Sequence, residues 1–223
     1  MNHKTLIEAS KVSFIVVLLV VLIGFILAMS AVIGIGFNKK RRYRWLEVLF
    51  ILPMFIPPSA IGYLILIVFG RNGWIGRFLY ETFDISIIFT LTAAVIAGVV
   101  VTFPIMYQSI KSAVLSIDED IINAARVYGA SELTIWLKII SPLSIHGILN
   151  GMLLSFARAF GEFGATILVA GNIPGKTQTL PMALYYAIEN NNDQQAMLIL
   201  VVIFIVAIFL VSLYKTLLNY MRY

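Results

Sequence analysis

The chain has 223 residues, of which 61% are hydrophobic and 12% charged, so it is far more apolar than a soluble domain, of which about half is apolar. It contains no cysteine, which excludes disulfides and thiolate metal sites, and neither of its two histidines has metal-ligand spacing around it, so no metal site is expected. The net charge of +5 comes from basic residues between apolar stretches, where they set membrane topology, so we expect no nucleic-acid partner. The composition predicts an integral membrane protein that contacts a lipid bilayer.

An apolar helix needs about 20 residues to cross the hydrocarbon core of a bilayer. Five stretches meet this length, at residues 12–37, 46–70, 85–110, 143–170 and 196–218. The strongest run of positive charge, residues 39–44, follows the first stretch, and short basic loops stay on the cytoplasmic side. With the N-terminus outside and the C-terminus inside, the inner segments hold ten Lys and Arg residues and the outer segments five. The sequence thus predicts an all-α protein with five transmembrane helices and with residues 111–142 in the cytoplasm.

The long polar segment after the third apolar stretch predicts two short helices joined by a sharp turn. Ser116 followed by Glu119 has the spacing of a capping box, which predicts a helix that begins near Ser116. Gly129 supplies the left-handed residue that ends many helices, Ser131 can cap a second helix, and Pro142 limits how far that helix continues. A DNA-binding helix-turn-helix has a similar texture, but acidic residues outnumber basic ones here, which argues against contacts to phosphates.

The same segment resembles the EAA signature, EAA-x3-G-x9-I-x-L-P, of permease subunits of ABC importers. Its spacing is complete, with Asn123 where the family has Glu and Ser141 where it has Leu. The resemblance implies that residues 111–142 form a coupling loop and that residues 131–138 are the helix that docks on a separate ATPase subunit. The coupling-loop residues implied in this way are Asn123, Ala124, Ala125, Gly129, Ala130, Ser131, Glu132, Leu133, Ile139 and Pro142.

Three prolines, Pro53, Pro57 and Pro58, interrupt the second apolar stretch. Each removes a backbone donor, and lipid cannot satisfy the carbonyl groups that are left free. Such breaks are tolerated where neighbouring helices or an aqueous cavity replace the lost hydrogen bonds. We therefore expect this segment to face the transport pathway or the interior of the bundle; a merely kinked packing helix is the alternative.

Two charged residues, Arg158 and Glu162, lie near the middle of the fourth apolar stretch, and Phe163 follows them. Residues four apart share one face of a helix, and an unpaired charge at this depth costs about 3 kcal/mol or more, so the sequence predicts that the two side chains pair. We consider these three residues candidates for the pathway or its gate. A buried pair that only fixes helix packing is an equally good interpretation.

Residues 170–177, AGNIPGKT, satisfy a relaxed phosphate-binding loop pattern. A true loop of this kind follows a buried strand in a soluble domain, whereas this one follows an apolar span on the predicted outer side, so we expect a docking surface for an extracytoplasmic partner. The chain offers one intramembrane carboxylate and no cluster of His, Cys or metal ligands, so acid-base or redox chemistry is not expected and no catalytic residue is assigned.

Stretches outside the coupling loop are similar to the molybdate permease family, ModB. In the second apolar stretch they are LP at 52–53, IPP at 56–58 and GYL at 62–64. Further along the chain they are GRNGWIG at 70–76, FARAFGEFGAT at 156–166 and GNIPGKTQTLP at 171–181. The resemblance implies the type I ABC importer permease fold over residues 5–218. Sulfate permeases share part of this texture, so sulfate or tungstate is the alternative substrate.

The family resemblance also implies the assembly. Two copies of the chain form one pathway in the cytoplasmic (inner or plasma) membrane, two ATPase subunits drive alternating access, and a binding protein delivers molybdate from outside. ATP and magnesium bind to the ATPase, so no cofactor is expected in this chain. A stand-alone secondary transporter is a less favoured alternative, because it gives no reason for a capped cytoplasmic hairpin with EAA spacing.

Overall fold

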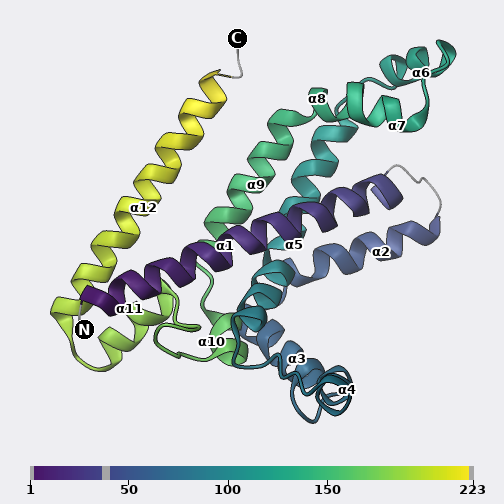
Figure 1. Cartoon of the computed structure of the whole chain (residues 1–223). Coiled ribbons are helices and arrows are strands. Elements are labelled where there is room, and N and C mark those ends of the chain that lie inside the picture. Colours follow the sequence, from purple (N-terminus) through teal and green to yellow (C-terminus); the bar gives the residue numbers. More distant parts are fainter. Residues whose placement is uncertain (1–2, 37–40, 221–223) are drawn as a thin grey trace.

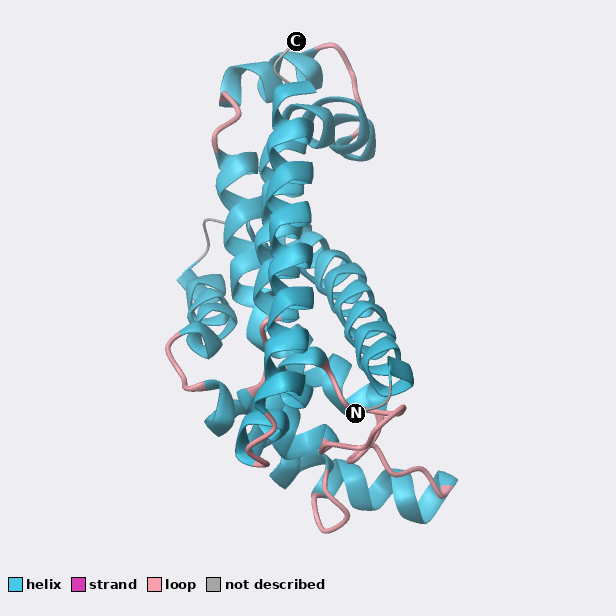
Figure 2. Cartoon of the chain, turned by 90° about the vertical axis from the view of Figure 1, so that its left-hand side faces the viewer, coloured by secondary structure: helices cyan, strands magenta, loops and turns pink. Residues whose placement is uncertain are grey.

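The computed structural model describes residues 3–36 and 41–220, and this part of the chain is built of helices without a strand (Figures 1 and 2). The α-helices are α1 (His3–Ala31), α2 (Arg41–Ile51), α3 (Pro58–Phe69), α4 (Trp74–Phe83), α5 (Leu91–Leu115), α6 (Glu119–Val127), α7 (Glu132–Ile135), α8 (Ser141–Leu143), α9 (Ile145–Phe160), α10 (Gly164–Ala170), α11 (Leu180–Glu189) and α12 (Asp193–Tyr220). Two π-helical turns, η1 (Val32–Gly36) and η3 (Trp136–Ile140), and one 3-10 turn, η2 (Leu52–Met54), continue neighbouring helices.

Three segments of the described chain are long and apolar enough to cross a membrane as single helices, at Thr5–Ile35, Leu91–Leu115 and Asp193–Thr216. Two further segments are bent pairs of helices. The segment Trp45–Met54 meets Pro58–Phe69 at 115°, and Glu132–Leu143 meets Ile145–Phe160 at 69°. By length and composition, counting each bent pair as one crossing gives up to five, and the all-α membrane class is confirmed. The second pair begins at Glu132, within the predicted cytoplasmic loop, rather than at residue 143.

The long helix α5 lies at the centre of the bundle, packed against α1 and α9, while α10 fills the space between α3 and α5 (Figure 1). Small residues on α5, among them Ala93, Ala94, Ala97 and Gly98, let the neighbouring backbones come close, which is how membrane helices pack in the absence of a hydrophobic driving force. Nearer its end, Met106, Tyr107 and Ile110 are fully buried. The helix therefore forms the central axis of the bundle.

The two ends of the bundle differ. The short helices α6 and α7 project beyond α5 and α9 at one end, called here the hairpin end, and α12 finishes at the same end (Figure 1). The N-terminus of α1, with α10 and α11, lies at the opposite end, called here the far end (Figure 1). Helix α12 contacts mainly α11 and is almost entirely exposed along its length. In a bilayer, an apolar helix surface of this kind lies against lipid or another chain.

Several helix boundaries differ from the predicted stretches. Helix α1 begins at His3 rather than at residue 12, and α5 begins at Leu91, with the hydroxyl of Thr90 as its cap. The fourth stretch is interrupted, because α9 ends at Phe160 and α10 begins at Gly164. Within the basic run 39–44, residues 39 and 40 and the side chains of the rest lie outside the described residues, so the topology predicted from it stays a prediction.

Candidate functional site

The first helix of the predicted coupling loop begins two residues later than expected. Asp118 caps α6, since its carboxylate accepts a hydrogen bond from the backbone N–H of Asp120 at 2.9 Å. Ser116 instead ends α5, and its hydroxyl donates to the carbonyl of Ala113 at 2.7 Å. The predicted capping box is therefore wrong. Packing of the buried Val114, which is 1% exposed, carries α5 on to Leu115, so Ser116 serves as the C-cap of α5 and cannot cap the helix that follows.

The turn between α6 and α7 follows the prediction. Gly129 has φ +80°, the left-handed conformation, and the N–H of Ala130 donates to the carbonyl of Ala125 at 3.0 Å. The hydroxyl of Ser131 caps α7 by accepting from the N–H of Thr134 at 3.3 Å. The chain then stays helical through η3 and α8, so Pro142 does not stop it, and the 69° bend comes at the break before Ile145.

A three-residue polar cluster links α6 to α7. The guanidinium of Arg126 donates to both carboxylate oxygens of Glu132, at 2.7 and 3.1 Å, and to the amide oxygen of Asn123 at 3.1 Å. The hydrogen bond from Arg126 holds the pKa of Glu132 below its usual range. Asn123, which replaces the usual glutamate of the EAA signature, thus orients an arginine through a neutral oxygen.

The tip of this hairpin exposes apolar side chains. Val127, Tyr128, Leu133 and Leu137, together called the hairpin tip, are between 63% and 91% exposed. In contrast, Ile135 and Ile140 are buried and hold α7 and η3 against the bundle. A cluster of exposed large apolar residues rimmed by polar ones is typical of a protein interaction surface.

The structure brings together the two groups of predicted pathway residues. Pro58 begins α3. A Cβ placed on Gly164 would lie 3.3 Å from the Cβ of Pro58. A Cβ placed on Gly62 would lie 2.8 Å from the Cα of Ala165, so α3 and α10 pack backbone against backbone. The proline break of the second stretch, with Pro53 in η2 and the exposed Pro57, therefore lies beside the break of the fourth stretch.

The predicted ion pair is present, but in a different setting. The Nη1 atom of Arg158 lies 2.6 Å from Oε2 of Glu162, with the side chains 33% and 3% exposed. Glu162 follows the end of α9 rather than lying within a continuous helix, and its Oε1 accepts from the N–H of Ala165 at 2.8 Å. The aromatic ring of Phe163 packs on that of Tyr185, with 4.9 Å between the ring centroids. One buried carboxylate thus caps α10 and neutralises an arginine.

The loop that resembles a phosphate-binding loop uses its own donors. The backbone N–H groups of Lys176, Thr177 and Gln178 all donate to the carbonyl of Ile173, at 2.9 to 3.1 Å. The hydroxyl of Thr177 donates to the carbonyl of Gly171 and accepts from the N–H of Ile173. Backbone N–H groups that are bonded within the loop are not free to bind a phosphate, so the pattern here builds a compact loop instead of a nucleotide site.

One interaction was not predicted. Lys111 on α5 lies 2.6 Å from the carboxylate of Glu47 on α2, which also accepts a hydrogen bond from Tyr107 at 3.2 Å. Glu47 is 60 positions from Tyr107 and 64 positions from Lys111 in the chain. The predicted topology could have indicated this contact, because it placed the start of the second stretch, with Glu47, and the end of the third, with Lys111, at the same membrane face. Among the residues that the structure describes, no group of His, Cys, Asp and Glu could hold a metal ion.

Comparisons with known proteins agree with this arrangement. Residues 20–220 match the family described as binding-protein-dependent transport system inner membrane component. The chain is 45% identical over 174 residues to YvgM of Bacillus subtilis, a candidate molybdenum transport system permease protein, and the match covers 77% of each chain. It is 43% identical over 144 residues to the molybdenum transport system permease protein ModB of Haemophilus influenzae, covering 65% of this chain and 63% of that protein, which is less than two thirds of its length.

The fold is similar to that of a solved importer. A chain of the MetNI methionine ABC transporter in an inward-facing conformation superposes with a TM-score of 0.75 at 16% sequence identity, covering 96% of this chain and 95% of that one. At this identity the likeness concerns the fold alone. The family match over most of the chain and the relatives at 43–45% identity show that the chain belongs to the binding-protein-dependent transport system inner membrane components, as a ModB-like permease of ABC importers.

Proposed function

We propose that the chain is the permease subunit of an ATP-driven importer that moves molybdate across the cytoplasmic membrane by alternating access, as a homodimer. Relatives named as molybdenum transport permeases support the substrate, and the importer fold supports the mechanism. The proposed orientation has the N-terminus outside and the C-terminus inside. It agrees with Figure 1, in which α12 ends at the same end of the molecule as the hairpin while α1 begins at the far end.

The observation that carries this proposal is the hairpin tip. Four large apolar side chains are held outward on a turn whose two helices are tied by the Arg126–Glu132 pair. A separate ATPase subunit, which binds ATP and magnesium, docks on this surface, and this chain carries no hydrolytic chemistry. A stiff, capped hairpin transmits displacement that a floppy loop would absorb.

Motion at the hairpin reaches the membrane through α5, which leads into the hairpin, and α9, which leads out of it. The Glu47–Lys111 bond fastens α2 to α5 at the same end, so the proline break moves with the hairpin. The break at residues 161–163 leads directly into α10, which packs on α3 where Gly62 meets Ala165, and this break is then the gate of the pathway. Helices that are broken inside the membrane at such contacts are typical of transport pathways.

Molybdate is a dianion, and Arg158 is the cation of the gate. Because Glu162 neutralises much of its charge, this chain provides a path of low affinity, and the extracytoplasmic binding protein selects the anion. That partner docks at the far end, where the loop 171–179 is rigid through its internal hydrogen bonds.

The test is ATP hydrolysis by the chain copurified with its ATPase in proteoliposomes, with binding protein loaded with molybdate, tungstate or sulfate. We expect molybdate to stimulate hydrolysis several-fold and sulfate to have no effect. Stimulation by sulfate alone would leave the importer in place and overturn the substrate. Failure of any ATPase to copurify would overturn the coupled mechanism and favour a secondary transporter.

A further inference from the structure

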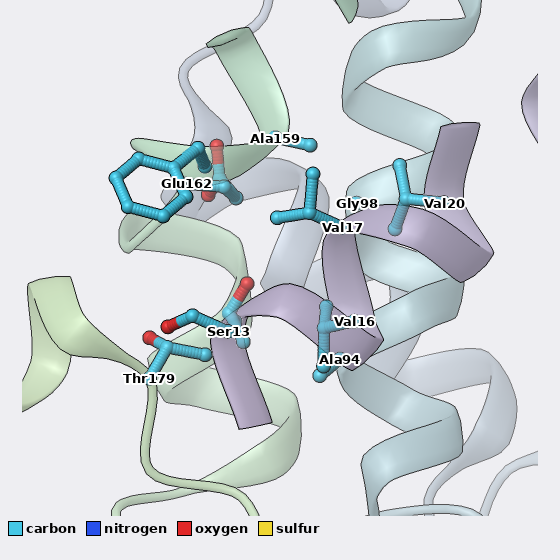
Figure 3. A pocket seen from close by; sticks show the side chains of 11 residues that line it. Ser13, Val16, Val17, Val20, Ala94, Gly98, Ala159, Glu162 and Thr179 are labelled. Carbon is cyan, nitrogen blue, oxygen red and sulfur yellow. The ribbon is translucent and has the colours of Figure 1, made fainter. Parts of the chain in front are cut away.

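A small cavity lies at the far end of the bundle, between α1, α5 and the segments that flank α10 (Figure 3). Its volume is about 10 Å³, the space of a single water molecule. Valine and alanine side chains form much of its wall. The polar lining consists of Ser13 on α1, Glu162 at the break, Thr166 on α10 and Thr179 just before α11.

Thr179 gives the cavity its chemistry. The residue is 5% exposed, and its hydroxyl has no hydrogen-bond partner among the described residues. A buried hydroxyl without a partner costs about 1–3 kcal/mol, and proteins usually satisfy such groups with an ordered water. Ser13 also lines the cavity, and Figure 3 shows its side chain close to that of Thr179.

Ser13 supplies the second contact. Its oxygen accepts a hydrogen bond from the backbone N–H of Leu180 at 2.7 Å, so its own proton is left to donate. Since Thr179 has no direct partner, Ser13 and Thr179 are not bonded to each other. We infer that the cavity binds one water molecule, which accepts from Ser13 and donates to Thr179, with Thr166 and Glu162 as the other polar groups in reach of its hydrogen-bonding positions.

The charges around the cavity select a neutral ligand. The carboxylate of Glu162 is already bonded to Arg158 and to the N–H of Ala165, so a metal cation would compete with a guanidinium at 2.6 Å. An anion would face the same carboxylate and would meet hydroxyl groups only. A water molecule satisfies both hydroxyls at no cost in charge.

The bound water is a positioning site rather than a part of the pathway. It joins α1 to the start of α11, next to the break that holds Glu162, and so fixes the loop 171–179 against the bundle. The inference stands on the cavity and its hydroxyls and does not depend on which anion the chain transports.

A double-mutant cycle with Ser13→Ala and Thr179→Val in the full chain, in nanodiscs, tests the bridge through thermal unfolding. If one water joins the two hydroxyls, each single variant lowers Tm by about 2–4 °C, and the double variant lowers it by clearly less than the sum. The loss of the Leu180 bond cancels in the cycle, because it occurs in both Ser13→Ala backgrounds. Additive losses would overturn the water bridge.

Thr179→Ser is the matched control, since it keeps the hydroxyl and removes only a methyl group. Because removing this buried methyl group is destabilising by itself, the two cycles are compared rather than the Tm values. The losses from Thr179→Ser and Ser13→Ala should add, since the hydroxyl is kept, and a coupling as large as that with Thr179→Val would show that packing, not the hydroxyl, matters. A high-resolution cryo-EM map of the wild-type chain provides a measurement without variants. Density between Ser13 and Thr179 supports the site, and a map that resolves other buried waters but not this one overturns it.

Discussion

Two arginine–glutamate pairs, one at each helix break of the candidate site, have almost the same geometry and opposite surroundings. Arg158 and Glu162 lie 2.6 Å apart, and Arg126 and Glu132 lie 2.7 Å apart. In the first pair the carboxylate side chain is 3% exposed, and in the second it is 64% exposed. A short distance therefore does not tell how much an ion pair contributes to stability. That contribution depends mainly on the free-energy cost of removing each charge from water.

The surroundings also decide what else depends on each glutamate. Glu162 holds the first turn of α10 through the N–H of Ala165, so the break of the fourth stretch rests on it. Glu132 lies in the first turn of α7, where the helix dipole favours a negative charge, but Ser131 already caps that helix. Losing the partner arginine should accordingly damage the buried pair far more than the exposed one.

The largest effect is expected for Arg158→Met. It leaves Glu162 buried and uncompensated, which should cost about 3 kcal/mol of unfolding free energy, toward the lower end of the range for buried pairs because Arg158 is one-third exposed. Denaturant unfolding in detergent measures the loss. Adding Glu162→Gln should recover part of it, and losses of the two changes that simply add would show that the pair is not coupled.

Gly62→Ala tests whether the buried pair needs the close contact of α3 and α10. The new Cβ would lie 2.7 to 2.8 Å from the backbone of Ala165, so the helices must separate, at a cost of roughly 1–3 kcal/mol, and transport should fall. Gly161→Ala is the control, because its Cβ would meet nothing closer than 3.8 Å. Equal Tm values for the two variants would show that this contact is not tight in solution.

Gly129→Val tests the exposed break, where backbone conformation rather than charge sets the turn. A β-branched residue at φ +80° costs about 1–2 kcal/mol, which should distort the hairpin and reduce substrate-stimulated ATP hydrolysis while the rest of the bundle keeps its Tm. Gly129→Asn should retain most of the stimulation, since Asn adopts this conformation more readily. Unchanged hydrolysis in the valine variant would contradict the lever mechanism.

The smallest effect is expected for Glu132→Gln, which should leave Tm within experimental scatter. Because the pKa of Glu132 is held below its usual value, the pair contributes fully above the ordinary carboxyl pKa of about 4.3 and is lost only as pH falls through the lowered value. Tm differences between wild type and variant should therefore be flat from about pH 6 to 8. A difference that grows across this window would assign Glu132 a larger role than its exposure allows.

Local chemistry made much of the site predictable from the sequence. Spacing and turn residues predicted the hairpin, with its left-handed Gly129 and its Ser131 cap, and the high cost of lone charges in lipid predicted the Arg158–Glu162 pair. The sequence did not predict the break at residues 161–163, because side chains four residues apart can pair equally well within a continuous helix and across a helix end. The contact of Pro58 with Gly164 and the Glu47–Lys111 bond depend on tertiary packing, which periodicity does not record.

The neutral amide of Asn123 bears on which ATPase the proposed docking surface would accept. Permeases with the usual EAA signature present a carboxylate at this position, whereas this hairpin holds Arg126 through an uncharged oxygen and carries one negative charge fewer. An ATPase groove that placed a cation opposite the usual glutamate would lose that attraction here, and small differences of this kind are how related partners are told apart. If an ATPase docks on this hairpin as proposed, a groove built for a neutral amide at this position would fit it better than one built for a carboxylate.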